Sequence, residues 1–220
     1  PHPTIFFDKL LADTEDIDFV VKGEYETALV NLAEALSKGL PYENIDGIVF
    51  RKNGAVVNNP PAKLVDPLDS LPMPARDLFP ENDKPNPTVY WDGFCENSPS
   101  VQMHSSRGCP YRCNFCLWNQ VMYREGKYRT FSPKRVCDEI EYCVKKYGIK
   151  EVYFDDDDFT INKKQVTEIC DEIINRGLKV KWSCMGDIIN LSEELIEKMA
   201  KAGLIGIKFG IETGSPEMLK

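Results

Sequence analysis

Residues 101–116 read Val-Gln-Met-His-Ser-Ser-Arg-Gly-Cys-Pro-Tyr-Arg-Cys-Asn-Phe-Cys, a short apolar strand pattern followed by a cysteine-rich loop. Three of the eight cysteines of the chain, Cys109, Cys113 and Cys116, lie in this loop with the spacing Cys-x3-Cys-x2-Cys. The chain is long enough to build a hydrophobic core without disulfides, and nothing in it indicates export. The crowding of thiols therefore indicates a metal or cluster site in a reducing compartment.

Two kinds of metal group use cysteine thiolates in this way. A structural zinc site takes four ligands, commonly from two Cys-x2-Cys pairs, and the chain has only one such pair. Cys95 or His104 could supply the fourth ligand, so zinc stays open as an alternative. An open [4Fe–4S] cluster explains the count of three better, because three thiolates hold three irons and leave the fourth iron for a chelating ligand.

Beyond Ser100, apolar strand patterns alternate with helical patterns. The helices begin at the N-cap residues Ser132, Asn162 and Ser192 and end at glycines. From the second strand onward the strands start about 26 residues apart, the size of a βα unit, which predicts a parallel sheet with helices outside it. The four strands are expected at residues 101–104, 151–154, 178–184 and 204–211.

The chemistry of a parallel α/β sheet or barrel lies at the carboxyl ends of its strands. The three-cysteine loop follows the first strand, so it is expected at this edge. Four carboxylates, Asp155 to Asp158, follow the second strand, and they form either a solvated acidic turn or a cation site that relieves their repulsion. The sequence stops after the fourth strand. Because four parallel strands with an exposed last edge make a poor free-standing barrel, we expect that this chain is a fragment or that another segment completes the sheet.

Residues 1–98 have a different pattern. A strand is predicted at residues 17–21, followed by a helix that ends at Gly39. A β-hairpin is predicted at residues 46–58 around Asn53-Gly54, a residue pair favoured in type I′ turns. Eight prolines in residues 60–87 predict an extended linker, and its apolar side chains indicate that it lies against a domain surface.

Composition limits the partners and the location that are expected. The 220 residues carry 27 basic and 35 acidic side chains, and this net charge of -8 argues against a general nucleic-acid binder. The mean hydropathy is -0.36, no window approaches the ~18 apolar residues that a membrane span needs, and no signal peptide is visible. Together with the thiol chemistry, these features predict a cytoplasmic protein.

In its βα context, the three-cysteine loop resembles the radical S-adenosylmethionine (SAM) superfamily. That family carries a CxxxCxxC loop after the first strand of a partial (β/α)6 barrel, usually with an aromatic residue before the last cysteine, here Phe115. The resemblance covers residues 100–220. It implies that Cys109, Cys113 and Cys116 hold a [4Fe–4S] cluster whose unique iron is chelated by SAM. An electron from the cluster then cleaves SAM to methionine and a 5′-deoxyadenosyl radical, which abstracts hydrogen from an unactivated carbon.

The same resemblance implies several side chains that contact SAM. Asp-Asp-x-Phe-Thr after the second strand is typical of the cobalamin-binding branch, and similar enzymes carry Gly-Ile-Glu-Ser/Thr-Gly after the fourth strand. An arginine is common in relatives near Asp187, where this chain departs from the pattern, so Ser183 is a substitute candidate. The residues that the resemblance assigns to SAM are Phe115, Asp155, Asp157, Ser183 and Glu212.

The N-terminal residues resemble the end of a cobalamin-binding Rossmann-like domain. Pro1-His2-Pro3-Thr4 matches a loop of that domain, Gly23-Glu24-Tyr25-Glu26 matches the end of a strand, and Leu71 to Pro80 matches the linker of the same family. The resemblance implies cobalamin contacts at Pro1, His2, Gly23 and Glu24. It divides the chain into the end of the cobalamin domain (1–45), a hairpin with a Pro-rich linker (46–98) and the first four strands of a radical SAM barrel (99–220).

The fold class expected from these features is α/β, with the tail of a Rossmann-like domain, a Pro-rich linker and a partial parallel (β/α) barrel. The implied function is cobalamin-dependent methylation of an unactivated carbon, with a small-molecule substrate and an external electron donor of the flavodoxin or ferredoxin type. One alternative is a radical cyclase of the anaerobic magnesium-protoporphyrin monomethyl ester cyclase type, which the sequence also resembles. A second alternative is a non-catalytic binding module stabilised by zinc. Neither nucleic acid nor a membrane is an expected partner.

Overall fold

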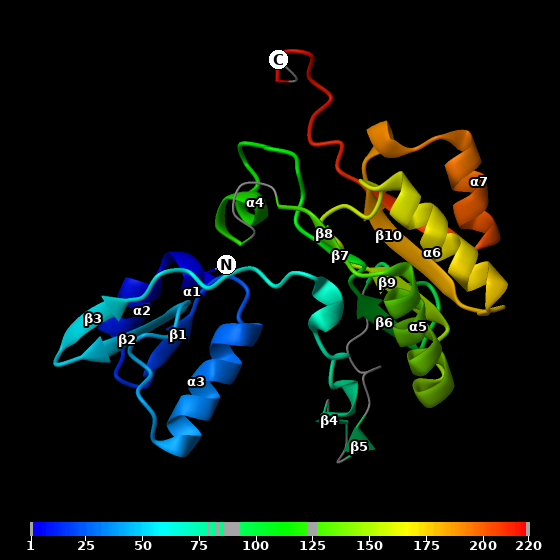
Figure 1. Cartoon of the computed structure of the whole chain (residues 1–220). Coiled ribbons are helices and arrows are strands. Elements are labelled where there is room, and N and C mark those ends of the chain that lie inside the picture. The colour runs from blue at the N-terminus through cyan, green and yellow to red at the C-terminus, as the bar shows by residue number, and fades with distance from the viewer. Residues whose placement is uncertain (1, 79, 82–83, 86–92, 123–126, 219–220) are drawn as a thin grey trace. The chain divides into compact units, whose positions relative to one another are not determined.

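The computed structural model describes residues 2–78, 80–81, 84–85, 93–122 and 127–218. The chain forms two compact units, one from residues 1–66 with 108–128 and the other from residues 67–107 with 129–220. Each unit contains a sheet of its own, antiparallel in the first and parallel in the second (Figure 1).

The first unit is built on a three-stranded antiparallel sheet. Its strands are β1 (Phe19–Val21), β2 (Ile48–Lys52) and β3 (Ala55–Asn58), with β2 in the middle. Helices α1 (His2–Ile5) and α2 (Phe7–Asp13) precede the sheet, α3 (Glu26–Lys38) follows β1, and α4 (Leu117–Val121) comes from the second segment of this unit.

Alternation along β2 gives this sheet two apolar faces. Ile48 and Phe50 pack with Ala28 and Leu32 of α3, whereas Val49 packs with Leu11 of α2 on the other side. The sheet therefore lies between helices α2 and α3.

The structure confirms part of what the sequence predicts for this unit. The helix ends at Gly39, and the hairpin turn uses Asn53 and Gly54 with φ of 52° and 80°, as a type I′ turn requires. One expectation was wrong. Residues 2–5 form a helical turn rather than a loop, because Pro3 is compatible with the first turn of a helix. The sequence carries no signal for the partner of the first strand, and in the structure β1 pairs antiparallel with β2 of the hairpin.

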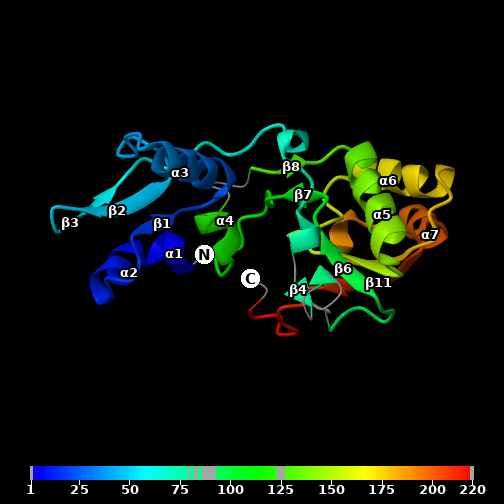
Figure 2. The ribbon, with the colours of Figure 1, turned by 90° about the horizontal axis from the view of Figure 1, so that it is seen from below.

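The second unit contains the predicted parallel α/β sheet. Its strand order is β11-β10-β9-β6, with β6 (Ser100–Met103), β9 (Glu151–Phe154), β10 (Lys181–Gly186) and β11 (Leu204–Phe209) all parallel. Helices α5 (Pro133–Tyr147), α6 (Lys163–Asn175) and α7 (Glu193–Lys201) lie along the same face of this sheet (Figures 1 and 2). The arrangement is that of a partial (β/α) barrel.

The three predicted N-caps are confirmed. The side chains of Ser132, Asn162 and Ser192 each accept a hydrogen bond from the backbone N–H three residues later. The third strand starts later than expected, at Lys181, because Gly177 adopts φ 61° and the Leu178 N–H still donates to the Ile173 carbonyl at the end of α6. The fourth strand ends at Phe209, two residues earlier than expected.

Short elements complete the second unit. Strands β7 (Ser106–Arg107) and β8 (Arg129–Thr130) pair antiparallel, as do β4 (Pro80–Glu81) and β5 (Lys84–Pro85). Among the described residues, 3-10 turns cover 68–70, 76–78 and 188–190.

The proline-rich segment is divided between the units, with residues 60–66 in the first unit and the described residues from 67 onward packing within the second. Arg76 is buried, forms an ion pair with Glu139 at 2.6 Å and donates to the Gln102 carbonyl at 2.8 Å. Asp69 accepts the Ser132 N–H at 2.8 Å, and Leu68 is fully buried. Of its apolar side chains, Leu68 is buried, whereas Met73 and Leu78 are exposed.

Residues 93–99 cover the sheet face opposite the helices. The Phe94 ring stacks on Tyr153 at 5.8 Å between centroids, and the Glu151 carboxylate accepts the backbone N–H groups of Glu96 and Asn97 at 2.9 and 2.7 Å. Both faces of β9 are therefore buried, which explains why its four residues are all inaccessible.

Candidate cofactor site

The three-cysteine loop belongs to the first unit and leads into α4. Cys113 is exposed, and Cys109 and Cys116 are half-buried. The Cys116 N–H donates to the Cys113 carbonyl at 3.1 Å, which closes a turn just before the helix. Phe115 lies inside this turn, and its side chain is 67% exposed. The turn thus leaves Phe115 and the Cys113 thiol accessible for contact with a ligand.

The other five cysteines are buried, and four of them, Cys137, Cys143, Cys170 and Cys184, belong to the core of the second unit. Burial raises the pKa of the Cys137 and Cys170 thiols to about 12 and that of Cys143 to about 11. Burial also raises the pKa of Cys184, which points into the helix-covered face of the sheet. Because the thiolate is the form that binds metal, we assign these four buried thiols to packing.

The donor set of the loop fits an iron–sulfur cluster in its chemistry. The loop supplies three thiols at short spacing. The structure describes all eight cysteines of the chain, and none of them forms a disulfide. In the part of the chain that the structure describes, no three Cys, His, Asp or Glu side chains converge where they could hold a metal ion. Cluster binding would therefore have to bring the three sulfurs together.

A glycine closes the base of this loop. Gly108 adopts φ 90°, and a Cβ on it would lie 2.0 Å from the Lys127 carbonyl oxygen. A side chain at this position would collide with backbone, so the two ends of the segment 108–127 can cross closely only because residue 108 is glycine.

The acidic run after β9 divides into two kinds of carboxylate. Asp155 is exposed and Asp157 half-buried, whereas Asp156 and Asp158 are buried. The Asp155 N–H donates to the Met103 carbonyl and extends the pairing of β9 with β6. The two aspartates that the resemblance assigns to SAM are thus the two that a ligand can reach.

The buried aspartates are held by neutral donors. Asp156 accepts hydrogen bonds from Ser105 and Ser106, and Asp158 accepts the N–H and hydroxyl of Thr160, both at 2.8 Å. Burial raises the pKa of both carboxyls, and these hydrogen bonds oppose the rise. Thr160 in turn accepts the Asp187 N–H at 2.8 Å, which ties the end of β10 to the same turn.

The two remaining residues assigned to SAM occupy different environments. Ser183 is buried in β10, and its hydroxyl donates to Glu151 at 3.2 Å on the face covered by residues 93–99. Glu212 is exposed beyond the end of β11 and adopts φ 57°. Glu212 therefore lies at the carboxyl edge of the sheet, and Ser183 lies within the sheet.

The residues assigned to cobalamin lie in the first unit, except that Pro1 falls outside the described residues. His2 is exposed in α1, and the Gly23 N–H donates to the Thr4 hydroxyl at 3.1 Å. Glu24 is buried and accepts the Val65 N–H at 3.0 Å. One hydrogen bond therefore joins the two sequence motifs on which this resemblance is based.

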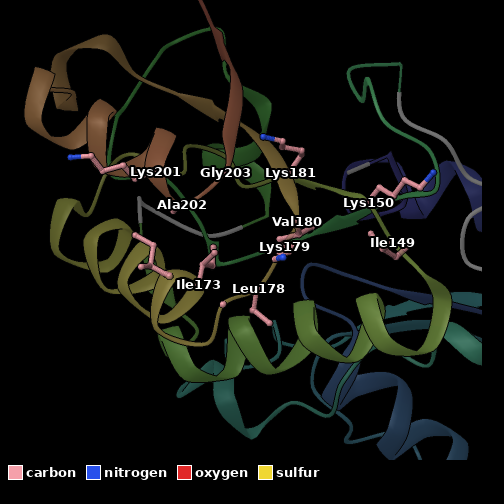
Figure 3. A pocket seen from close by; sticks show the side chains of 12 residues that line it. Ile149, Lys150, Ile173, Leu178, Lys179, Val180, Lys181, Lys201, Ala202 and Gly203 are labelled. Atoms are coloured by element: carbon pink, nitrogen blue, oxygen red, sulfur yellow. The ribbon is translucent and has the colours of Figure 1, made fainter.

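A pocket of about 530 Å³ opens at the opposite edge of the parallel sheet (Figure 3). Ile149, Leu178 and Val180 contribute its apolar lining, and Lys179 and Lys201 lie at its margin. These residues precede strands β9 and β10, except Lys201, which is the last residue of α7, where a lysine complements the helix C-terminus. In folds of this type the N-terminal edge serves stability and the carboxyl edge serves chemistry, so this pocket is not the candidate site.

Sequence reasoning missed the contacts that hold the site residues in place. The bonds from Ser105 and Ser106 to Asp156, and from Ser183 and Asn97 to Glu151, join segments 32 to 54 residues apart. Periodicity reports which residues share a face, and it carries no signal for such pairs.

Comparison with known proteins decides the family. The family model "Radical SAM superfamily" matches residues 103–220. The chain belongs to the radical SAM superfamily. An uncharacterized methyltransferase from Pyrococcus horikoshii is 34% identical over 220 residues, which are 100% of this chain and 46% of that protein. The anaerobic magnesium-protoporphyrin IX monomethyl ester cyclase of Cereibacter sphaeroides is 31% identical over 97% of this chain and 34% of that protein. This radical SAM chain thus spans less than half of the length of these relatives.

Solved structures share the fold. The cobalamin-dependent SAM radical enzyme OxsB, with aqua-cobalamin and SAM bound, has a TM-score of 0.76 at 18% identity. The match covers 100% of this chain and 31% of the OxsB chain. The radical SAM methyltransferase TsrM from Kitasatospora setae has a TM-score of 0.75 at 24% identity over 93% of this chain and 39% of its own. The described part of this radical SAM chain contains no helix that is long and apolar enough to cross a membrane.

Proposed function

We propose that this chain is part of an enzyme that cleaves SAM reductively and uses the radical for cobalamin-dependent methylation of an unactivated carbon. One observation carries the proposal: three thiols spaced Cys-x3-Cys-x2-Cys follow the first strand of a parallel βα sheet in a radical SAM chain. Cys109, Cys113 and Cys116 would hold a [4Fe–4S] cluster. When bound, such a cluster supplies the electron that cleaves SAM to methionine and a 5′-deoxyadenosyl radical.

The other candidate residues would bind and orient SAM. The exposed carboxylates of Asp155 and Glu212 and the half-buried one of Asp157 suit its ammonium and hydroxyl groups, and the exposed Phe115 ring suits an apolar contact. Ser183 is the weakest of the set, because its hydroxyl already donates to Glu151.

Cobalamin, the substrate and the donor belong to the same proposal. The names of relatives support methyl transfer, and the similar OxsB structure contains aqua-cobalamin. The cobalamin contacts proposed for this chain are Pro1, His2, Gly23 and Glu24. We further propose a small-molecule substrate, an electron donor of the flavodoxin or ferredoxin type, a cytoplasmic location, and the domain boundaries 1–45, 46–98 and 99–220.

Anaerobic reconstitution with iron and sulfide tests the cluster assignment. We expect about four iron and four sulfide per chain, a broad visible absorption band and 5′-deoxyadenosine on reduction with dithionite in the presence of SAM. Alanine at Cys109, Cys113 or Cys116 should lower the iron content and abolish 5′-deoxyadenosine. Cys143→Ala is the matched control, because this thiol is buried and should leave both quantities unchanged.

Two results would contradict the assignment. Undiminished 5′-deoxyadenosine from any of the three loop variants would exclude that thiol as a cluster ligand. A colourless protein with one zinc per chain would support the zinc-stabilised module instead.

A radical cyclase is the second candidate function, because relatives at 31% and 30% identity are named anaerobic magnesium-protoporphyrin IX monomethyl ester cyclase. Isotope-labelled SAM distinguishes the two in the complete protein. A methyltransferase moves the labelled methyl group to a product, whereas a cyclase leaves the label in methionine.

A further inference from the structure

The Asp156 carboxylate is buried beside the residues that lead into the three-cysteine loop. Asp156 is 2% exposed, and Ser105 and Ser106 are each 1% exposed. Its Oδ1 accepts the Ser105 N–H at 3.1 Å, the Ser105 hydroxyl at 2.9 Å and the Ser106 hydroxyl. Its Oδ2 accepts the Ser105 N–H at 3.1 Å. One side chain therefore satisfies every side-chain donor of two consecutive buried residues.

The same serines begin a short antiparallel neck, which consists of residues 105–107 and 129–131. The Phe131 N–H donates to the Ser105 carbonyl at 2.9 Å, and β7 pairs with β8 through Ser106↔Thr130 and Arg107↔Arg129. Cys109 follows Arg107 by two residues in the sequence. Asp156 thus connects the carboxyl end of β9 to the point where the chain leaves for the loop.

We propose that Asp156 is a positioning residue that fixes the neck and, through it, the backbone from which Cys109 departs. This inference rests on the proposed function, in which the loop binds a cluster. Without an acceptor at residue 156, three buried donors would lose their partner, and the neck would open to find other partners or water. Asp156 itself touches neither cluster nor SAM in this proposal.

Asp158 provides a matched control in the same turn. It is 5% exposed and also accepts hydrogen bonds from a backbone N–H and a hydroxyl, but both come from Thr160, two residues away. Its loss should therefore disturb the turn at residues 158–160 without releasing the neck. Asp156→Asn is a conservative variant, because an amide oxygen at the Oδ1 position keeps the acceptor on which three donors converge.

Hydrogen exchange of the metal-free chain tests the anchor directly. For Asp156→Ala we expect the amides of residues 105, 106 and 131 to exchange about tenfold faster or more, as for the loss of a hydrogen bond to a charged group. Asp158→Ala should leave these amides unchanged, and Asp156→Asn should restore most of their protection. If the neck amides exchange at the same rate in Asp156→Ala and in Asp158→Ala, Asp156 does not anchor the neck.

Cluster binding tests whether the anchor positions the loop. After anaerobic reconstitution, Asp156→Ala should bind less iron than Asp158→Ala and should show an altered electron paramagnetic resonance spectrum when reduced. A faster-exchanging neck with wild-type iron content and spectrum would overturn the positioning role. If the wild-type chain bound no iron, the proposed function would fail, while the exchange experiment would still decide whether Asp156 holds the neck.

Discussion

Burial separates two kinds of cysteine residue in this chain, and the difference has a consequence for pH dependence. The pKa of Cys137 and Cys170 is raised by burial to about 12, from an ordinary value of 9.0. The folded state therefore keeps these protons while the unfolded state releases them. The contribution of these buried, protonated thiols to the free energy of unfolding is therefore fully present below pH 9.0. It is lost as the pH rises from there toward about 12.

We predict that the free energy of unfolding falls between about pH 8 and about pH 10.5 by roughly 1 to 2 kcal/mol for each such thiol. Urea unfolding at the two pH values measures this loss. Cys170→Ala should make the loss smaller, whereas Cys113→Ala should not, because Cys113 is exposed. Equal pH dependence in wild type and Cys170→Ala would contradict the role of burial.

At the scale of elements, one buried ion pair attaches the proline-rich segment to helix α5. Arg76 and Glu139 are both about one tenth exposed, and Arg135 lies 3.3 Å from the other Glu139 oxygen. Because Arg76→Ala leaves a buried carboxylate with a weaker partner, we predict a loss of about 3 kcal/mol in the free energy of unfolding.

Lys134→Ala is the comparison for this prediction. It breaks the exposed pair with Asp138 on the same helix and should cost at most about 0.5 kcal/mol. Urea unfolding of the second unit measures both variants. Equal costs would show that the segment contributes nothing through this pair.

Local signals predicted most elements of the second unit. In the second unit, the strand at residues 151–154 and the N-caps Ser132 and Asn162 appear as the sequence indicates, and in the first unit so does the hairpin pair Asn53-Gly54. The pairing of β1 with β2 was missed, because it joins segments separated by a helix and depends on tertiary contacts.

The candidate site was predictable to a similar extent. The order of strands predicted which residues follow their carboxyl ends, but not which of the four aspartates would be buried. Asp156 and Asp158 are buried because serine and threonine donors lie close to them in the folded chain. Ser183 also could not be placed from its strand pattern, since its partner Glu151 lies on the neighbouring strand.

At the scale of the whole molecule, the two compact units assign the cysteine loop and the carboxylates to different parts of the structure. The loop belongs to the unit formed by residues 1–66 and 108–128, while Asp155, Asp157 and Glu212 belong to the parallel-sheet unit. The central claim of the account is that the three thiols of the loop hold a [4Fe–4S] cluster whose fourth iron binds SAM.

Electron paramagnetic resonance of the dithionite-reduced, anaerobically reconstituted chain tests this claim most directly. The account predicts the signal of a reduced [4Fe–4S] cluster that changes when SAM is added, because SAM occupies the iron that no cysteine binds. It also predicts that Asp155→Ala and Glu212→Ala raise the SAM concentration needed for the change. A cluster signal that stays the same at saturating SAM would contradict the account.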